Sequence, residues 1–197
     1  PGAFTKSLAE LPDVTLRYQH NLTTLPLGRT KAGTLRLTET ERGLHVIKQY
    51  ERFRATEYGD GWTTGGRPIR SKGFGHSNLL ETVPFDEGVP WTIEYAHEVL
   101  VNHDLPYFYN LLTPHLKIDV PDEIWSIFGS LAMNKGAKGL YTSEPWKILH
   151  DTSDPYHKEA FCESILTYAT EITVNGEVVK KKGLRWRRIA EAGLYLQ

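Results

Sequence analysis

The sequence predicts an α+β fold: a β-rich N-terminal half, arranged as a barrel or a meander, followed by a helix-rich C-terminal half with one β-hairpin. Two observations carry this prediction. Apolar and polar residues alternate in several short stretches of the first half, which is typical of strands. In the second half, apolar residues recur at spacings of three and four, as on one face of a helix. The character changes around residues 84–90, so we expect two regions, 1–88 and 89–197.

In the first half, we expect one short helix before a β-meander. The helix covers residues 3–10 and ends at Pro12, because proline removes a backbone donor. Alternating side chains predict strands over residues 14–19, 34–38 and 43–50. Residues 57–75 contain so many glycines that we expect a long loop with at most one short strand.

In the second half, apolar periodicity predicts a series of helices. Asp154 and Pro155 provide an N-cap and a first-turn proline for one of them. Asn175-Gly176, between two β-prone runs, predicts a tight hairpin over residues 172–179. The expected helices cover residues 92–102, 106–112, 121–133, 144–149, 154–169 and 184–196.

Composition limits the classes of partner. Lys and Arg number 23 against 24 Asp and Glu, and this balance argues against nucleic acid, which requires a basic excess. The single Cys162 excludes an internal disulfide. No apolar run approaches the roughly 20 residues that span a bilayer, so we expect a soluble protein without a membrane span. The compartment stays open.

We expect no cofactor and no metal. Glu94 and His97 have the Glu-x-x-His spacing of di-iron bundles, but such a site needs a second pair and two further carboxylates. A basic cluster over residues 180–188 is interpreted as a solvated face of the hairpin and the last helix, with contact to phosphates or an acidic partner as the alternative.

Five linked segments near the start of the chain carry a family resemblance. They are Pro1–Glu10, Tyr18–His20, Leu25–Arg29, Thr34–Leu37 and Arg42–Leu44. In order and approximate spacing they resemble the prohead (capsid-maturation) serine proteases of tailed bacteriophages. The resemblance implies that His20 is the catalytic base.

The same resemblance implies a nucleophile in a Ser-x-Gly-Phe motif, matched here by Ser71-Lys72-Gly73-Phe74, and an orienting acid in a later strand, matched by Glu81. The chemistry is consistent, because a serine hydroxyl needs an imidazole to take its proton. Gly73 would let backbone N–H groups approach an oxyanion. Ser77, after His76, is the alternative nucleophile.

The resemblance therefore implies a serine endopeptidase, or a degenerate relative, that cleaves scaffold or coat polypeptides. Its partners are then those proteins, or neighbouring subunits of an assembly. The alternative is a non-catalytic structural or accessory subunit of a large assembly, such as a virion or an organellar complex. Aromatic residues enriched in the expected helices favour this alternative, because Tyr and Trp are common at protein interfaces.

Overall fold

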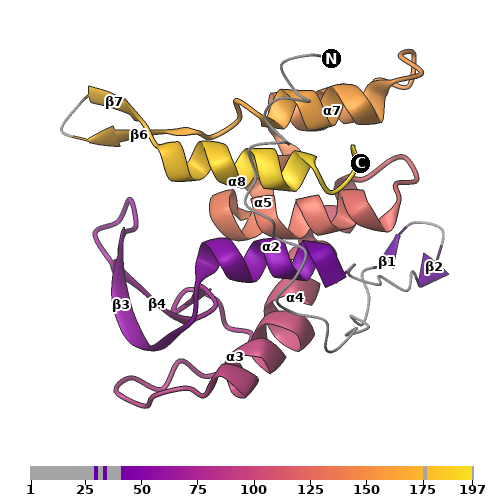
Figure 1. Ribbon diagram of the computed structural model, residues 1–197. Helices are drawn as coiled ribbons and strands as arrows, with labels where there is room; N and C mark the ends of the chain where they lie inside the picture. The colour runs from indigo at the N-terminus through magenta and orange to yellow at the C-terminus, as the bar shows by residue number, and fades with distance from the viewer. Residues whose placement is uncertain (1–28, 31–32, 35–40, 175–176, 197) are drawn as a thin grey trace.

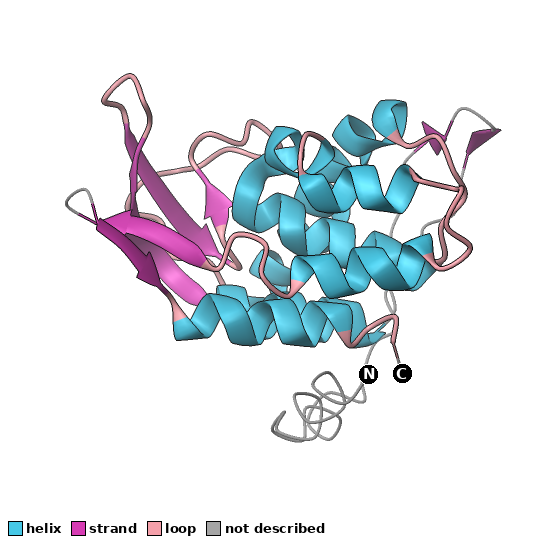
Figure 2. Cartoon of the chain, turned by 90° about the horizontal axis from the view of Figure 1, so that it is seen from above, coloured by secondary structure: helices cyan, strands magenta, loops and turns pink. Residues whose placement is uncertain are grey.

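The computed structural model describes residues 29–30, 33–34, 41–174 and 177–196. Most of this part of the chain is helical, and the helices pack in layers (Figure 1). The hairpin formed by β3 (Arg54–Trp62) and β4 (Pro68–Gly73) lies at one end of the molecule. The hairpin formed by β6 (Glu171–Val174) and β7 (Glu177–Lys180) lies at the same end in both views (Figures 1 and 2).

The other elements follow the chain as one short strand pair, a helix, a short strand and a run of helices. They are β1 (Arg29–Thr30), β2 (Gly33–Thr34), α2 (Glu41–Glu51), β5 (His76–Ser77), α3 (Ile93–Val99), the π-helix η1 (Leu100–Asp104), α4 (Leu105–Leu112), the 3-10 turn η2 (Thr113–His115), α5 (Asp122–Tyr141), α6 (Glu144–His150), α7 (His157–Ile165) and α8 (Lys182–Ala192).

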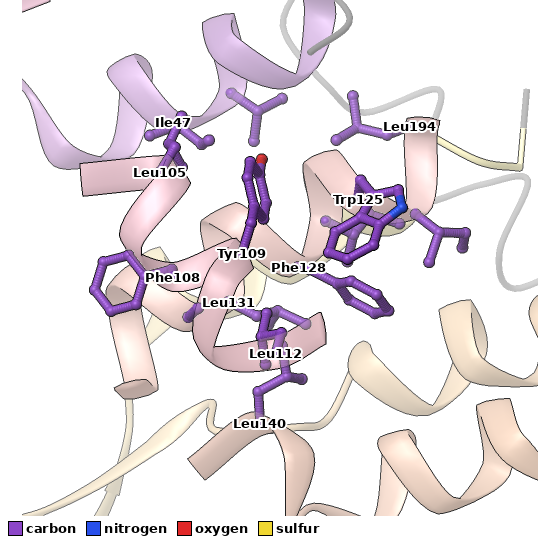
Figure 3. Close-up of a cluster of buried hydrophobic side chains, with 14 of the residues drawn as sticks. Ile47, Leu105, Phe108, Tyr109, Leu112, Trp125, Phe128, Leu131, Leu140 and Leu194 are labelled. Atoms are coloured by element: carbon purple, nitrogen blue, oxygen red, sulfur yellow. The ribbon is translucent and has the colours of Figure 1, made fainter. Parts of the chain in front are cut away.

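The core lies between α2, α4 and α5, with side chains from the later helices closing it (Figure 3). Leu105, Leu112, Phe128 and Leu131 are fully buried, and each contributes about 1.5–3 kcal/mol by leaving water. Close packing at this point requires Gly129. A Cβ there would lie 2.6 Å from the hydroxyl oxygen of Tyr109 on the facing helix α4, so only glycine allows the two helices this approach.

The prediction of a β-rich first half is wrong for the described residues. Residues 43–50, expected as a strand, lie within helix α2. Leu44 and Ile47 are buried on one side of this helix, at a spacing of three residues. Residues 57–75, expected as a loop, form most of the β3–β4 hairpin, whose ladder tolerates the glycines through two register shifts. The helix expected over 3–10 and the strand over 14–19 lie outside the described residues.

The predicted helices are present, but several bounds differ. Helix α7 begins at His157 and ends at Ile165, so the helix expected over 154–169 is shorter, and its N-cap is Tyr156 and not Asp154. Helix α8 covers residues 182–192 and not 184–196. The helical segment α5 extends past residue 133 to Tyr141, but a kink divides it at Gly136, whose φ of 75° and ψ of 154° are not helical. The two helices expected over 92–112 join through the π-helix η1 into one continuous segment. The hairpin strands on either side of residues 175–176 are confirmed. Among the described residues, no helix is long and apolar enough to cross a membrane.

Candidate active site

A carboxylate lies where helix α2 meets the β3–β4 hairpin. Glu51 is the last residue of α2, and 16% of its side chain is exposed. Its Oε2 faces the backbone of Gly75, where a Cβ would lie only 2.7 Å away. Gly75 also has a φ of 82°, which favours glycine. The tight turn between β4 and β5 therefore closes one side of the Glu51 carboxyl group.

Arg187 on α8 covers the other oxygen of this carboxylate. Its Nη1 lies 2.6 Å from Glu51 Oε1, and its Nε donates to Glu191 Oε1 at 3.1 Å. Its Nη2 donates to the backbone carbonyl of Ser130 at 2.9 Å. Burial alone would lower the pKa of Arg187, but Glu51 and Glu191 together raise it above its ordinary value. Arg187 therefore stays charged and fixes the Glu51 side chain.

A second carboxylate lies on β3. Asp60 is exposed and accepts a hydrogen bond of 2.8 Å from the hydroxyl of Ser71 on the neighbouring strand β4. The strand register explains this contact, because Tyr58 pairs with Ser71 and Gly59 with Arg70. Side chains opposite or diagonal on the same face of an antiparallel pair are close enough to interact.

Tyr58 links the two carboxylates electrostatically. Burial, followed by Asp60 and Glu51, raises the pKa of the Tyr58 phenol, while a hydrogen bond with Ser71 acts in the opposite direction. Both carboxylates therefore act on the same phenol. The arrangement brings one shielded and one solvated carboxylate to one place, with a hydroxyl beside the solvated one.

A buried, hydrogen-bonded pair of side chains holds the strand that follows. His76 and Asp104 are each 1% exposed, and His76 Nδ1 lies 3.0 Å from Asp104 Oδ1. Thr82 donates its hydroxyl to the same oxygen at 2.6 Å. The pair ties β5 to the π-helix η1 and so fixes the β4–β5 turn that faces Glu51.

Lys72 fixes the next position of β4. It is fully buried, and its Nζ donates to the carbonyls of Asp86 at 2.7 Å and Val89 at 3.3 Å. The ammonium lies 4.8 Å from the ring centroids of both Phe85 and Trp91, a favourable cation–π distance. Residues 85–91 are thus held against the face of β4 opposite Ser71.

The structure distributes the predicted catalytic residues differently from a Ser-His-acid triad. His20 lies outside the described residues. Ser71 is buried, and its hydroxyl donates a hydrogen bond to the carboxylate of Asp60. Glu81 is exposed in the loop after β5 and contacts neither Ser71 nor Asp60 through a hydrogen bond or ion pair. The alternative nucleophile, Ser77, accepts a hydrogen bond from the backbone N–H of Leu79.

Sequence reasoning missed Glu51, Asp60 and Arg187. One signal was present for the carboxylates: an acid at the end of an apolar-patterned stretch, followed by an acid flanked by Gly59 and Gly61. Arg187 carried no local signal, because its neighbours Arg185 and Arg188 give the same basic pattern. Only the docking of α8 on α2 separates the buried arginines from the exposed one.

Comparison with known proteins gives two different results. The family model of the caudovirus prohead serine protease matches residues 1–56. Most of these residues lie outside the described part of the chain, and the match covers neither Asp60 nor Ser71. No curated protein matches the chain.

Solved structures match most of the chain. The muramidase domain of SpmX from Asticaccaulis excentricus has a TM-score of 0.65 at 19% identity and covers 81% of this chain and 97% of its own. The endolysin of Escherichia coli O157:H7 phage FAHEc1 has a TM-score of 0.63 at 25% identity, and the match covers 81% of this chain and 93% of the endolysin. P22 lysozyme has a TM-score of 0.60 at 20% identity, and the match covers 80% of this chain and 97% of the lysozyme.

These matches correct two predictions. The fold is a mixed α+β fold like that of lysozymes, with a small β part, and not a β-rich barrel joined to helices. The prediction of a capsid-maturation serine protease, with a structural subunit as its alternative, is wrong, because the similar structures are those of muramidases and endolysins. The resemblance to prohead proteases holds for residues 1–56 only.

Proposed function

We propose that this chain is a glycoside hydrolase of the muramidase type, which cleaves the glycan strands of peptidoglycan. The observation that carries the proposal is that two carboxylates from different elements lie beside β4: Glu51 against Gly75 in the turn that follows this strand, and Asp60 hydrogen-bonded to Ser71 on it. Hydrolysis of a glycosidic bond characteristically uses two carboxyl groups on either side of the bond. The muramidase and endolysin names of the similar structures support the choice of polymer.

The two carboxylates have environments suited to different roles. Glu51 is shielded by Gly75 and Arg187, and Asp60 is solvated and hydrogen-bonded by Ser71. In glycosidases the more shielded carboxyl group typically acts as the acid, and the solvated, hydrogen-bonded one stays ionised. We assign to Glu51 the transfer of a proton to the leaving glycosidic oxygen.

Asp60 then acts on the sugar carbon, either directly or through a water whose proton it takes. The Ser71 hydroxyl donates to Asp60 and so orients the carboxylate. Ser71 is a positioning residue in this assignment, and no covalent bond to its oxygen is required.

The deciding experiment compares the wild-type chain with Glu51→Gln on purified peptidoglycan, with the release of new reducing sugar ends as the measurement. Glutamine keeps the shape of the side chain but cannot donate the proton. We expect the rate to fall by about 10²–10⁴-fold, the usual contribution of a general acid. The rate of the Asp60→Asn protein is expected to fall by a similar factor.

Glu81→Gln is the matched control, since Glu81 is exposed and outside the carboxylate pair. Its rate should equal that of the wild type. The proposal is wrong if folded wild-type protein releases no reducing ends, or if Glu51→Gln releases them at the wild-type rate.

A further inference from the structure

The β3–β4 hairpin has a second face that the proposed reaction does not use. Gly59 pairs with Arg70, and after a register shift Trp62 pairs with Pro68. Because side chains alternate along β4, Pro68 and Arg70 share one face, and Ser71 belongs to the other. Trp62 and Pro68 therefore lie on the face opposite the one where Ser71 meets Asp60.

A groove of about 500 Å³ opens on this face of the hairpin, and Tyr58 and Ile69, which by alternation belong to the Ser71 face, also contribute to its lining. Gly59 and Gly61 line it, and a Cβ at either position would meet open space. Its backbone floor is thus uncovered. Trp62 and Pro68 form one end, and Arg70 and Glu57 line the other part.

Trp62 has no role in the core. Its side chain is 70% exposed, the largest exposed fraction among the large apolar side chains of the described residues. No aromatic ring or cation among those residues packs on the Trp62 ring. Leaving an indole in water forgoes the 1.5–3 kcal/mol or so that burial of a large apolar side chain usually supplies, so fold stability does not account for this placement.

The charges of the groove select against a polyanion. Arg70 forms ion pairs with Glu87 and, at 4.0 Å, with Glu57. One cation thus faces two carboxylates, and phosphate-rich polymers would be repelled. The carboxylates, 25% exposed at Glu57 and 60% at Glu87, can accept hydrogen bonds from hydroxyl and amide groups.

A flat indole beside proline and bare glycine backbone fits the C–H face of a pyranose ring, with the carboxylates placed for its hydroxyls. Gly59 and Gly61 flank Asp60 in the sequence, so the groove and Asp60 belong to the same hairpin. We propose that this groove, formed by Gly59, Gly61, Trp62, Pro68 and Arg70, binds a stretch of uncharged N-acetylhexosamine glycan. The groove would hold the insoluble polymer by a glycan chain other than the one that is cleaved. This inference rests on the proposed function.

The test measures binding separately from cleavage. Full-length Glu51→Gln protein is mixed with purified insoluble peptidoglycan, and the bound fraction is measured by co-sedimentation. Adding Trp62→Ala should weaken binding at least fivefold. Adding Gly59→Ala should weaken it too, because the new methyl group projects into space that the structure leaves open.

Thr64→Ala on the same hairpin is the matched control, since Thr64 is exposed and does not line the groove. It should bind as Glu51→Gln does. A soluble tetramer of β-1,4-linked N-acetylglucosamine should compete for the Trp62-dependent fraction. Circular dichroism of each variant checks that it is folded, and because Gly59 and Trp62 are both exposed we expect unchanged spectra.

The possible failures are distinct. If the wild type cleaves peptidoglycan but Trp62→Ala and Gly59→Ala bind as the control does, the groove proposal is overturned and the proposed function stands. Trp62-dependent binding of a proline-rich peptide but not of the glycan tetramer, or Trp62-dependent self-association, would also overturn it. If the glycan binds through Trp62 while the wild type releases no reducing ends, the proposed function is wrong, but the proposal that the groove binds glycan is supported.

Discussion

Arg187 Nη1 lies 2.6 Å from Glu51 Oε1, so the last helix of the described chain supplies the partner of the carboxylate that ends α2. Arg187 is 5% exposed and also bonds Glu191 and Ser130. Its neighbour Arg188 is fully buried and bonds Glu191 and Asn134. These side chains form a buried network that joins α2, α5 and α8.

Replacing Arg187 by alanine should leave Glu51 without this cation, and Glu191 with Arg188 alone. Removing one partner of a buried pair costs about 3–5 kcal/mol, because the remaining charge is uncompensated. We expect that loss in the free energy of unfolding in urea, together with a lower rate of peptidoglycan cleavage. Arg187→Lys keeps the charge but loses the fork of donors, so it should recover part of the stability.

Arg185→Ala is the control for Arg187, because Arg185 lies on the same helix and is exposed. Its stability should stay within about 0.5 kcal/mol of the wild type. Equal stability of the Arg187→Ala and Arg185→Ala proteins would show that the ion pair does not stabilise the fold.

The His76–Asp104 pair gives a second prediction. Asp104→Asn keeps the shape of the side chain but removes the carboxylate that bonds His76, and it should lower the free energy of unfolding by about 1.5–3 kcal/mol. Thr82→Val removes the hydroxyl that donates to the same carboxylate, and should cost about 1 kcal/mol. Chemical denaturation of the three proteins at neutral pH measures both effects. A loss for Asp104→Asn no larger than that for Thr82→Val would contradict a stabilising His76–Asp104 contact.

Cys162 gives a prediction on pH. Burial, with smaller contributions from Glu159 and Glu163, raises the pKa of the Cys162 thiol far above its ordinary value of 9.0. The native state then holds a proton that the unfolded state releases above about pH 9, so this thiol makes stability fall as pH rises through and beyond that value. Cys162→Ala should show a shallower loss of stability between pH 9 and 11, although the cavity lowers its stability at pH 7. The same steepness in both proteins would contradict the shift.

The helices were predictable because apolar residues that recur at spacings of three and four over a long stretch are typical of helices and rarely of strands. Phe128 and Leu131 on α5 illustrate this, since both are fully buried at helical spacing. Helix α2 was mistaken for a strand because Leu44 and Val46 alternate while Leu44 and Ile47 have helical spacing, and a short window supports both patterns. The β3–β4 hairpin was mistaken for a loop because glycines at positive φ, such as Gly61 and Gly73, were read as breakers of regular structure.

The site was less predictable than the fold. Ser71 was singled out from the sequence, but as a nucleophile, and the structure gives its hydroxyl a carboxylate partner instead. Glu51 and Arg187 meet only when distant helices dock, and a contact of this kind leaves no trace in local spacing. The resemblance over the first residues concerned a stretch that contains neither Asp60 nor Arg187.

The distance along the chain between Glu51 and Arg187 also governs when the carboxylate is covered during synthesis. A chain growing from its N-terminus completes α2 and the β3–β4 hairpin well before α8 exists. Until the ribosome has released residue 187, Glu51 lacks the guanidinium of Arg187. A nascent or truncated chain therefore lacks the ion pair that fixes Glu51, which forms only in molecules translated through that helix.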